Sequence, residues 1–257
     1  MSDSGDGFLV RSLGATYSDG MVLADHDHPW GQFAYGRSGV MRVTTEGRSW
    51  LAPATRAVWL PPFRPHSIRM TGAVALRTLY LSPAVAAPLP DAACVMEVGP
   101  LLRELVLHIL ALGMLDPGVP EQVRLAGVLI DTIAAAPRED LALPLPQDSR
   151  ALALAEQIHA APGDRSGLPD LARSAGASLR TLQRIFPRET GLSLEAWRQK
   201  ARLIQAVARL SAGASVTGAA FDCGYDSPSA FIAAFRRQFG VTPGRYRPAH
   251  VGVRSSA

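Results

Sequence analysis

The second half of this chain contains an internal repeat, which constrains the fold more than any other feature of the sequence. A shift of 49 positions pairs Ser178 with Ser227, Leu182 with Phe231, Phe186 with Phe235, Gly191 with Gly240, Ser193 with Thr242, and Trp197 with Tyr246. Upstream the shift is 48 positions and pairs Leu168 with Val216, Ala172 with Ala220, and Gly176 with Gly224. Matching of polar, small and apolar positions alike indicates a duplicated supersecondary unit.

Each copy has the pattern of two short helices separated by a tight turn. The first helices, expected at residues 168–175 and 216–223, each end at a glycine, which adopts the left-handed conformation common at helix ends. Ser178 and Ser227 then follow as caps for the second helices. The pattern predicts a helix-turn-helix that occurs twice. Pro187 lies inside the second helix of the first copy, where a kink is expected.

Residues 194–211, which join the two copies, form one long helix in this interpretation. Apolar residues line two sides of that helix, so it is expected to lie between two bodies. Its 18 residues would span ~27 Å, and successive major grooves of DNA are about 34 Å apart. The connector therefore has a length that suits two readers in adjacent grooves.

The charge distribution supports a polyanionic partner for the repeat. Residues 1–149 hold 11 Arg and Lys against 15 Asp and Glu, a net charge of −4, whereas residues 150–257 hold 15 against 7, a net charge of +8. A folded segment with this excess of positive charge indicates contact with nucleic acid.

Polar and exposed positions of the second helices are the candidate DNA contacts. In the first copy they are Ser178, Arg180, Thr181, Gln183, Arg184 and Arg188. In the second copy they are Ser227, Ser229, Ile232, Ala233, Arg236 and Arg237. Arginine matches the edge of guanine and glutamine that of adenine. The second set has fewer such groups, so we expect it to contribute more phosphate and shape contacts than base readout.

Two stretches carry a family resemblance. GASLRTLQRIFPRETGLSLEAWRQKARL and SVTGAAFDCGYDSPSAFIAAFRRQFGVTPGRYR closely resemble the C-terminal domain of AraC/XylS-family transcriptional regulators. The resemblance covers about residues 150–247 and includes the closing G-x-T-P-x-x-Y-R at 240–247. It implies one chain with two helix-turn-helix units that read adjacent grooves of double-stranded DNA. It also implies a cupin-like effector domain in front of them, and a role as repressor or activator.

The first half has the pattern of a β-rich domain followed by helices. Short apolar runs punctuated by Gly and Pro across residues 8–82 predict many strands in a sandwich or barrel. A loop is expected at 84–95, and amphipathic helices at 98–115 and 121–135. In the first helix the predicted apolar stripe is Leu101, Leu105, His108, Ile109 and Leu112, and in the second it is Val123, Ala126, Leu129, Ile130 and Ile133.

Three histidines in this half form a candidate site. His26 and His28 are two positions apart, so in a strand they would point to the same face, and His66 follows a proline turn that would bring it near. The spacing resembles that of a cupin, with Gln32 in place of the usual glutamate. Three interpretations stay open: ligands of a divalent metal, polar lining of a small-molecule pocket, or histidines hydrogen-bonded within the core.

The predicted fold class is α+β, with a cupin-like β-barrel and two following helices before an all-α domain of two helix-turn-helix units joined by a long helix. We expect a sensor at 1–95, a helical, dimerising region at 96–136, a Pro-rich linker at 137–149, the DNA-binding domain at 150–248, and a disordered tail at 249–257. The two cysteines, Cys94 and Cys223, form no disulfide or zinc pattern.

The predicted function is a cytoplasmic, non-enzymatic transcription regulator. Its expected partners are double-stranded DNA, a small-molecule or metal effector, and a second copy of the chain in a homodimer. No signal peptide and no membrane span are visible in the sequence. The alternative function is a metal-dependent cupin enzyme, an oxygenase or isomerase, with a DNA-binding appendage.

Overall fold

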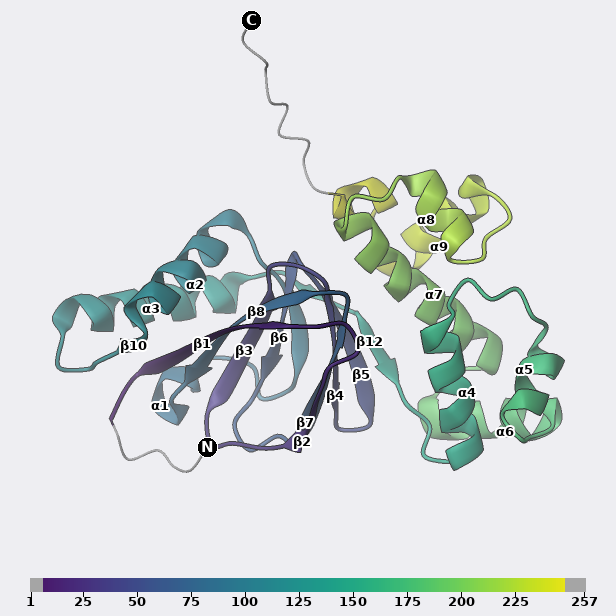
Figure 1. Ribbon diagram of the computed structural model, residues 1–257, viewed down its shortest axis with the longest axis horizontal. Coiled ribbons are helices and arrows are strands. Elements are labelled where there is room, and N and C mark those ends of the chain that lie inside the picture. Colours follow the sequence, from purple (N-terminus) through teal and green to yellow (C-terminus); the bar gives the residue numbers. More distant parts are fainter. Residues whose placement is uncertain (1–6, 248–257) are drawn as a thin grey trace, which may run out of the picture.

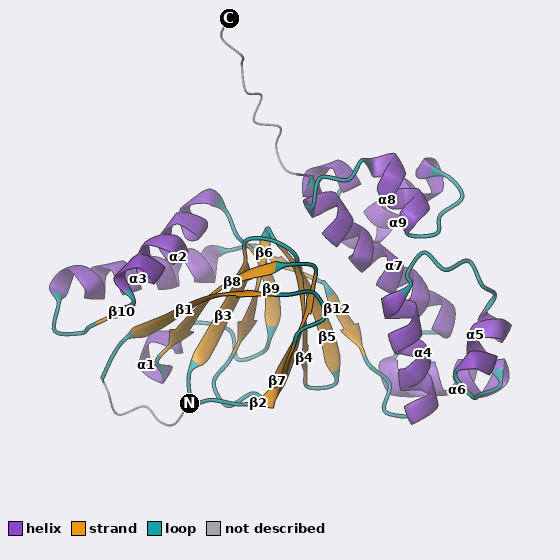
Figure 2. Cartoon of the chain, viewed as in Figure 1, coloured by secondary structure: helices purple, strands orange, loops and turns teal. Residues whose placement is uncertain are grey.

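The computed structural model describes residues 7–247 as a β-rich N-terminal part and an all-helical C-terminal part (Figures 1 and 2). This confirms the α+β class. The predicted tail at 249–257 lies outside the described residues. Within the described part of the chain, no helix is both long and apolar enough to span a bilayer.

Two antiparallel sheets make up the N-terminal part. In spatial order the larger sheet contains β10 (Met114–Leu115), β1 (Val10–Tyr17), β8 (Val74–Leu81), β3 (Gly31–Gly36), β6 (Arg56–Leu60), β9 (Cys94–Glu97) and β11 (Arg138–Glu139). The smaller sheet contains β12 (Ala142–Pro144), β5 (Arg48–Pro53), β4 (Val40–Thr45), β7 (His66–Thr71) and β2 (Val22–His26). No strand pairing joins the two sheets among residues 7–247, so the closed barrel of the prediction is not observed there.

Alternation along the strands gives the larger sheet two apolar faces. In β6, Val58 and Leu60 face a core shared with the smaller sheet, whereas Ala57 and Trp59 face a second core on the opposite side. The second core is closed by α2 (Pro100–Leu112) and α3 (Pro120–Ala135). The larger sheet is therefore the middle layer, covered by the smaller sheet on one face and by two helices on the other.

The position of α2 corrects the predicted apolar stripe. Its buried residues are Leu102, Val106 and Ile109, whereas Leu101 and Leu112 are 61% and 45% exposed and His108 is exposed. Both rows have helical spacing, and the choice between them depends on the angle at which the helix meets the sheet. In α3 four of the five predicted residues are buried, and Val123 is exposed.

The segments predicted as loop and linker contain regular structure. Residues 84–95 include most of α1 (Pro83–Ala86) and the start of β9. The linker expected at 137–149 contains β11, which pairs with β9, and β12, which pairs with β5. Leu141, Ala142 and Leu143 are buried, and this burial draws the segment into the core. The prediction of a free linker is therefore wrong for 138–144.

Arg56 and Glu139 fasten the same segment to the sheet. The guanidinium donates from Nε to Glu139 Oε2 at 2.9 Å and from Nη2 to Oε1 at 2.8 Å, a bidentate ion pair that is largely buried. Such a pair fixes direction as well as distance. Nothing in the spacing of residues 83 positions apart identifies it in the sequence.

The C-terminal part consists of six α-helices and a closing 3-10 turn, η1 (Pro243–Tyr246), within the described residues. The helices are α4 (Ser149–Ala160), α5 (Leu168–Ser174), α6 (Leu179–Thr190), α7 (Leu194–Ser211), α8 (Val216–Asp222) and α9 (Pro228–Phe239). The predicted connector thus has its expected bounds. Gly176 and Gly224 have φ of 72° and 77°, which confirms left-handed turns after α5 and α8.

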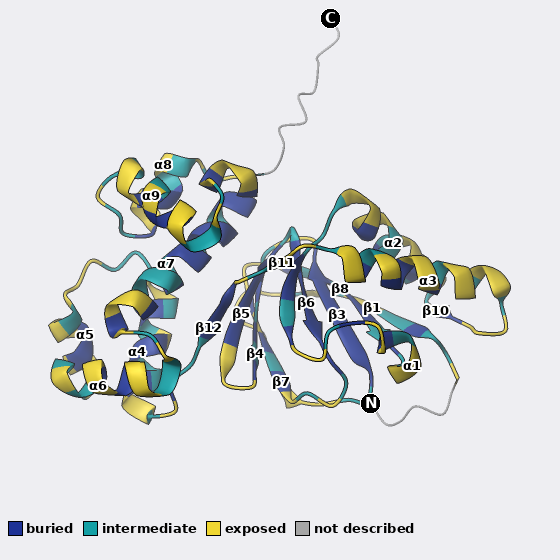
Figure 3. Ribbon diagram, turned by 180° about the vertical axis from the view of Figure 1, so that it is seen from behind, coloured by how far each residue is buried: buried dark blue, intermediate teal, exposed yellow. Residues whose placement is uncertain are grey.

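The two parts pack against each other through α7 and the smaller sheet. Trp197 is fully buried, and its Nε1 donates to the carbonyl oxygen of Pro144 at 2.6 Å. Lys200 forms an ion pair with Asp140, at 2.7 Å between Nζ and Oδ2. Glu189 accepts hydrogen bonds from the backbone N–H groups of residues 147 and 148. One apolar core accordingly runs from the sheets into the helices. Figure 3 shows buried stretches on β5, β12 and α7 in dark blue.

Candidate functional site

The first helix pair presents a capped second helix with an exposed polar face. Ser178 Oγ accepts from the backbone N–H of Thr181 at 3.1 Å, which confirms it as the cap of α6. Leu182, Ile185 and Phe186 are buried against the neighbouring helices. The remaining face of α6 is left to solvent, as required of a helix that enters a groove of DNA.

The predicted DNA contacts on α6 differ in their exposure and in whether another residue of the chain already binds them. Arg180, Gln183, Arg184 and Arg188 are exposed and Thr181 is half-buried. Arg180 and Arg184 have no ion-pair partner within residues 7–247, so their guanidinium groups are available to a ligand. Gln183 Nε2 donates weakly to Glu195 Oε1 at 3.4 Å.

Arg188 is already paired within the chain. Its Nη2 donates to Glu189 Oε1 at 2.6 Å, at the end of α6 that faces the segment before α4. Helix α6 runs unbroken through Pro187 to Thr190 and ends at Gly191, which has φ of 72°. Pro187 has no N–H to donate to the carbonyl of Gln183, so one helical hydrogen bond is missing at this position. Arg188 is therefore the least available of the predicted α6 contacts.

The second helix pair repeats the arrangement with a different surface. Ser227 Oγ accepts from the backbone N–H of Ala230 at 3.2 Å, and Pro228 occupies the first turn of α9. The exposed predicted contacts are Ser229, Ala233, Arg236 and Arg237, and Ile232 is half-buried. Arg236 and Arg237 have no ion-pair partner among the described residues and lie in the last turn of α9.

Contacts around α7 hold the two pairs together, and the sequence analysis did not identify them. Arg202 donates from Nε to the carbonyl oxygen of Pro162 at 3.0 Å and from Nη2 to that of Asp164 at 2.7 Å. Between them, a Cβ on Gly163 would lie 2.3 Å from the carbonyl oxygen of Asp222. The loop before α5 is therefore tied to both α7 and the end of α8. Arg198 and Arg202, four positions apart on one helix face, were the available signal.

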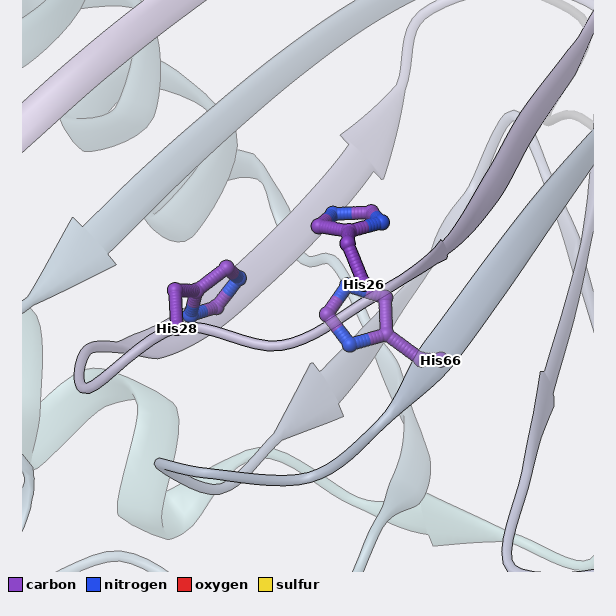
Figure 4. Close-up of side chains that lie close together, drawn as sticks. All are labelled: His26, His28 and His66. Atoms are coloured by element: carbon purple, nitrogen blue, oxygen red, sulfur yellow. The ribbon is translucent and has the colours of Figure 1, made fainter. Parts of the chain in front are cut away.

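A separate cluster of side chains lies at one end of the sheets. His26 at the end of β2 pairs directly with His66 at the start of β7, and the ring centroids are 4.3 Å apart. His28 lies 5.2 Å from His66 and 5.9 Å from His26 by the same measure. Figure 4 shows the three imidazoles gathered around one point, and their ligand atoms all lie within 4.8 Å of one another.

Convergence of the three histidines is confirmed, but the predicted reason for it is wrong in part. β2 ends at His26, so His28 belongs to the turn between β2 and β3 and does not share a strand face with His26. The turn places His28 beside His66, with the two rings edge-on to each other. The cluster has a buried side and an open side, because His66 is buried, His28 half-buried and His26 exposed.

The larger sheet completes the cluster with polar groups. Gln32 is buried on β3, and its Oε1 lies 3.2 Å from His28 Nε2 while its Nε2 donates to Thr78 Oγ1 at 3.2 Å. Tyr80, paired with Gln32 across the sheet, places its ring edge-on to His28 at 5.2 Å. The sequence analysis missed Thr78 and Tyr80, although their two-residue spacing on β8 was visible.

Burial sets the charge state at the closed side of the cluster. Desolvation is the largest cause that lowers the pKa of His66, to about 4, and the neighbouring imidazoles lower it further. His66 is therefore neutral near pH 7, the form in which imidazole acts as a ligand or a hydrogen-bond acceptor.

A groove of about 650 Å³ lies elsewhere, between α2, α3 and η1. Leu101 and Leu102 of α2, Asp131 and Ala135 of α3, and Arg245 of the C-terminal part line it. The groove thus touches both parts of the chain.

Two capped helix pairs, each exposing arginines that have no ion-pair partner within residues 7–247, define a DNA-binding protein of the helix-turn-helix class. A helix-turn-helix domain family matches residues 171–249. The HTH-type transcriptional regulator NimR of Escherichia coli is 33% identical over 229 residues, which cover 89% of this chain and 84% of NimR. The regulator RipA of Corynebacterium glutamicum is 34% identical over 113 residues, which cover 44% of this chain and 34% of RipA.

Among solved structures, ToxT from Vibrio cholerae with a bound unsaturated fatty acid covers 96% of each chain at 12% identity and a TM-score of 0.38. The match to a regulator over most of both chains is decisive, and the chain belongs to the AraC family of transcriptional regulators. It is a DNA-binding transcription regulator.

Proposed function

We propose that this chain binds a specific promoter sequence as a cytoplasmic, effector-responsive homodimer, with α6 as the main base reader and α9 as the main phosphate contact. The proposed division is a cupin-like sensor at 1–95, a dimerising region at 96–136 and the DNA-binding domain from residue 150. The observation that carries the proposal is the exposed face of α6, where Arg180 and Arg184 have no partner within the described chain.

Replacement of Arg184 by alanine tests the base reader. We expect Arg184→Ala to weaken binding to the preferred duplex by about 1–3 kcal/mol and to relax the preference at one base pair, because a bidentate arginine distinguishes guanine from other bases. The measurement is selection of bound DNA from a random duplex pool, followed by titration of the winning sequence and of single-base variants.

Two further variants serve as controls for that test. Arg237→Ala is expected to weaken all sequences alike, as loss of a phosphate contact would. Arg124→Ala, which removes an exposed arginine from α3 in the N-terminal part, is expected to leave both affinity and preference unchanged. If Arg184→Ala also weakens all sequences alike, α6 is not the base reader at that position.

The outer face of α2 supports the proposed homodimer. Leu101 and Leu112 are exposed and lie three turns apart on the same side of the helix, with the half-buried Leu105 between them. An aligned apolar row on a surface helix is typical of a protein interface.

We expect the double variant Leu101→Glu with Leu112→Glu to convert a dimer to a monomer while the fold is kept, because neither side chain belongs to the buried stripe. Sedimentation velocity measures the change. Met21→Glu, at a residue of similar exposure away from the helices, is the matched control and should stay dimeric. A monomeric parent protein, or a double variant that remains dimeric, contradicts the assignment.

Effector control is supported by the connection between the two parts. The groove near Arg245 has a volume in the range of small-molecule sites, and a ligand there would touch both parts. A ligand that favours one arrangement of the parts changes DNA affinity by its differential binding.

A further inference from the structure

We propose that His26, His28 and His66 bind one divalent transition-metal ion through their Nε2 atoms, with Gln32 Oε1 as a fourth ligand. The proposal is independent of the assignment of DNA contacts, since it concerns β2 and β7, at the edge of the smaller sheet away from the strands that α7 contacts, and has its own test.

Hydrogen bonds at the other ring nitrogens orient all three imidazoles. His26 Nδ1 lies 2.8 Å from the carbonyl oxygen of Ala24, His28 Nδ1 lies 2.7 Å from that of Trp30, and His66 Nδ1 lies 2.7 Å from that of Arg64. A carbonyl oxygen only accepts, so each Nδ1 carries the proton and donates it. In the neutral ring the lone pair is then on Nε2 in every case. Metal-binding histidines are held in this way, with the second nitrogen bonded to a carbonyl.

Two of these Nε2 lone pairs, those of His66 and His28, face no hydrogen-bond donor among the described residues. His66 Nε2 is buried with no hydrogen-bond partner within the described residues. His28 Nε2 and Gln32 Oε1 lie 3.2 Å apart, which places two acceptors face to face. Buried acceptors without donors are costly, at roughly 1–3 kcal/mol each. A cation bound to both atoms removes the mismatch. Two ligand atoms that each lie about 2.1 Å from one metal ion are separated by a distance close to the 3.2 Å found between His28 Nε2 and Gln32 Oε1.

The position of the donors makes a cup rather than a closed cage. His26 and His66 come from the smaller sheet, Gln32 from the larger one, and His28 from the turn that joins them. Because His26 is exposed, the site is open on one side. A site with an open side leaves room for a further ligand on the ion.

The donor set selects the class of ion and of its further ligand. Imidazole nitrogen suits Zn²⁺, Ni²⁺, Cu²⁺ and Co²⁺ better than Ca²⁺ or Mg²⁺, which prefer oxygen ligands. All four donors are neutral, so the bound ion keeps its full double positive charge. The open position therefore favours a small anion, such as a carboxylate or a hydroxide ion from water.

Cobalt is the probe that tests the site, with full-length protein free of a histidine tag. Co²⁺ is titrated into the chelator-treated protein while the visible absorption of its d–d bands and the thermal unfolding midpoint are recorded. We expect one ion per chain, an absorption spectrum of nitrogen-ligated cobalt, and a rise in the midpoint, because a ligand that binds only the folded state stabilises it.

Two ligand variants and one control complete the experiment. His26→Ala and His28→Ala change exposed or half-buried residues, and each should weaken Co²⁺ binding by more than about 10–100-fold, the loss typical of second-shell changes. His108→Ala removes an exposed histidine from α2 and should bind as the parent does. The proposal is overturned if the parent gives no cobalt spectrum, or if the two ligand variants bind as tightly as His108→Ala.

Discussion

Raising the salt concentration from 50 to 200 mM will weaken the binding of this protein to duplex DNA by roughly 40-fold. Arg180, Arg184, Arg236 and Arg237 are exposed on α6 and α9 and have no partner within the described chain. If Arg180, Arg236 and Arg237 each neutralise a phosphate while Arg184 contacts a base, released counterions give a log–log slope of about −2.7, which is about 40-fold for a fourfold rise in salt.

Fluorescence anisotropy of a labelled duplex across a salt series measures that slope. Arg237→Ala should make it shallower by about 1, because one phosphate contact and its counterion are lost. Arg124→Ala, on the acidic N-terminal half, should leave the slope unchanged. An affinity that does not depend on salt would mean that these arginines do not face the phosphates.

Local signals made the helical half predictable from the sequence. The bounds of α7 and the caps of α6 and α9 depend on residues within one turn of each helix end, such as Ser178, Ser227 and Gly191. The repeat then supplies each signal twice. Pro187 was the local exception, since α6 continues through it to Thr190.

Long-range pairing in the β-rich half was not predictable in the same way. The strands at 138–144 form because Arg56 pairs with Glu139 and because Leu141 and Leu143 are buried. Their partners are 42 to 96 residues away, and the prolines around them favour a linker when only neighbours are considered. The same limit applies to α2, where two rows of apolar residues have the same helical spacing. Packing against the sheet buries the row of Leu102 and leaves Leu101 exposed.

The histidine cluster lies between these cases. Its members were predicted because His26 and His28 are two positions apart and His66 follows a proline turn. The orientation of each ring was not predictable, since it is set by the carbonyl groups of Ala24, Trp30 and Arg64. Tyr80 joins the cluster only through the pairing of β8 with β3.

Replacement of Trp197 by alanine will destabilise the whole protein by about 3–5 kcal/mol, the cost of deleting a large aromatic side chain from a packed core. The ring is fully buried, with edge-on contacts to Phe186 at 5.5 Å and to His159 at 5.4 Å. Burial is also the main cause that lowers the pKa of His159 to about 3, so its ring packs as a neutral group near pH 7. The loss is a large share of the 5–15 kcal/mol by which domains are typically stable.

Chemical denaturation followed by circular dichroism measures this change. Trp197→Phe keeps most of the packing and removes the hydrogen bond to Pro144, so it is the matched control and should cost less than the alanine variant. Because Trp197 contacts the N-terminal part as well as α4 and α6, we expect one cooperative transition that shifts as a unit in Trp197→Ala. Two separate transitions, of which only the helical one shifts, would contradict a core shared by the two parts.

The repeat counterpart of Trp197 extends the argument. Tyr246 is buried, and the guanidinium of Arg56 lies over its ring at 5.0 Å, so each copy of the repeat places one aromatic residue against the N-terminal part. Tyr246→Ala should therefore lower the same transition, by less than Trp197→Ala because the ring is smaller and lies at the edge of the core. The combined variant should lose about the sum of the two, since Trp197 bonds to Pro144 of β12 whereas Tyr246 contacts Arg56 of β6.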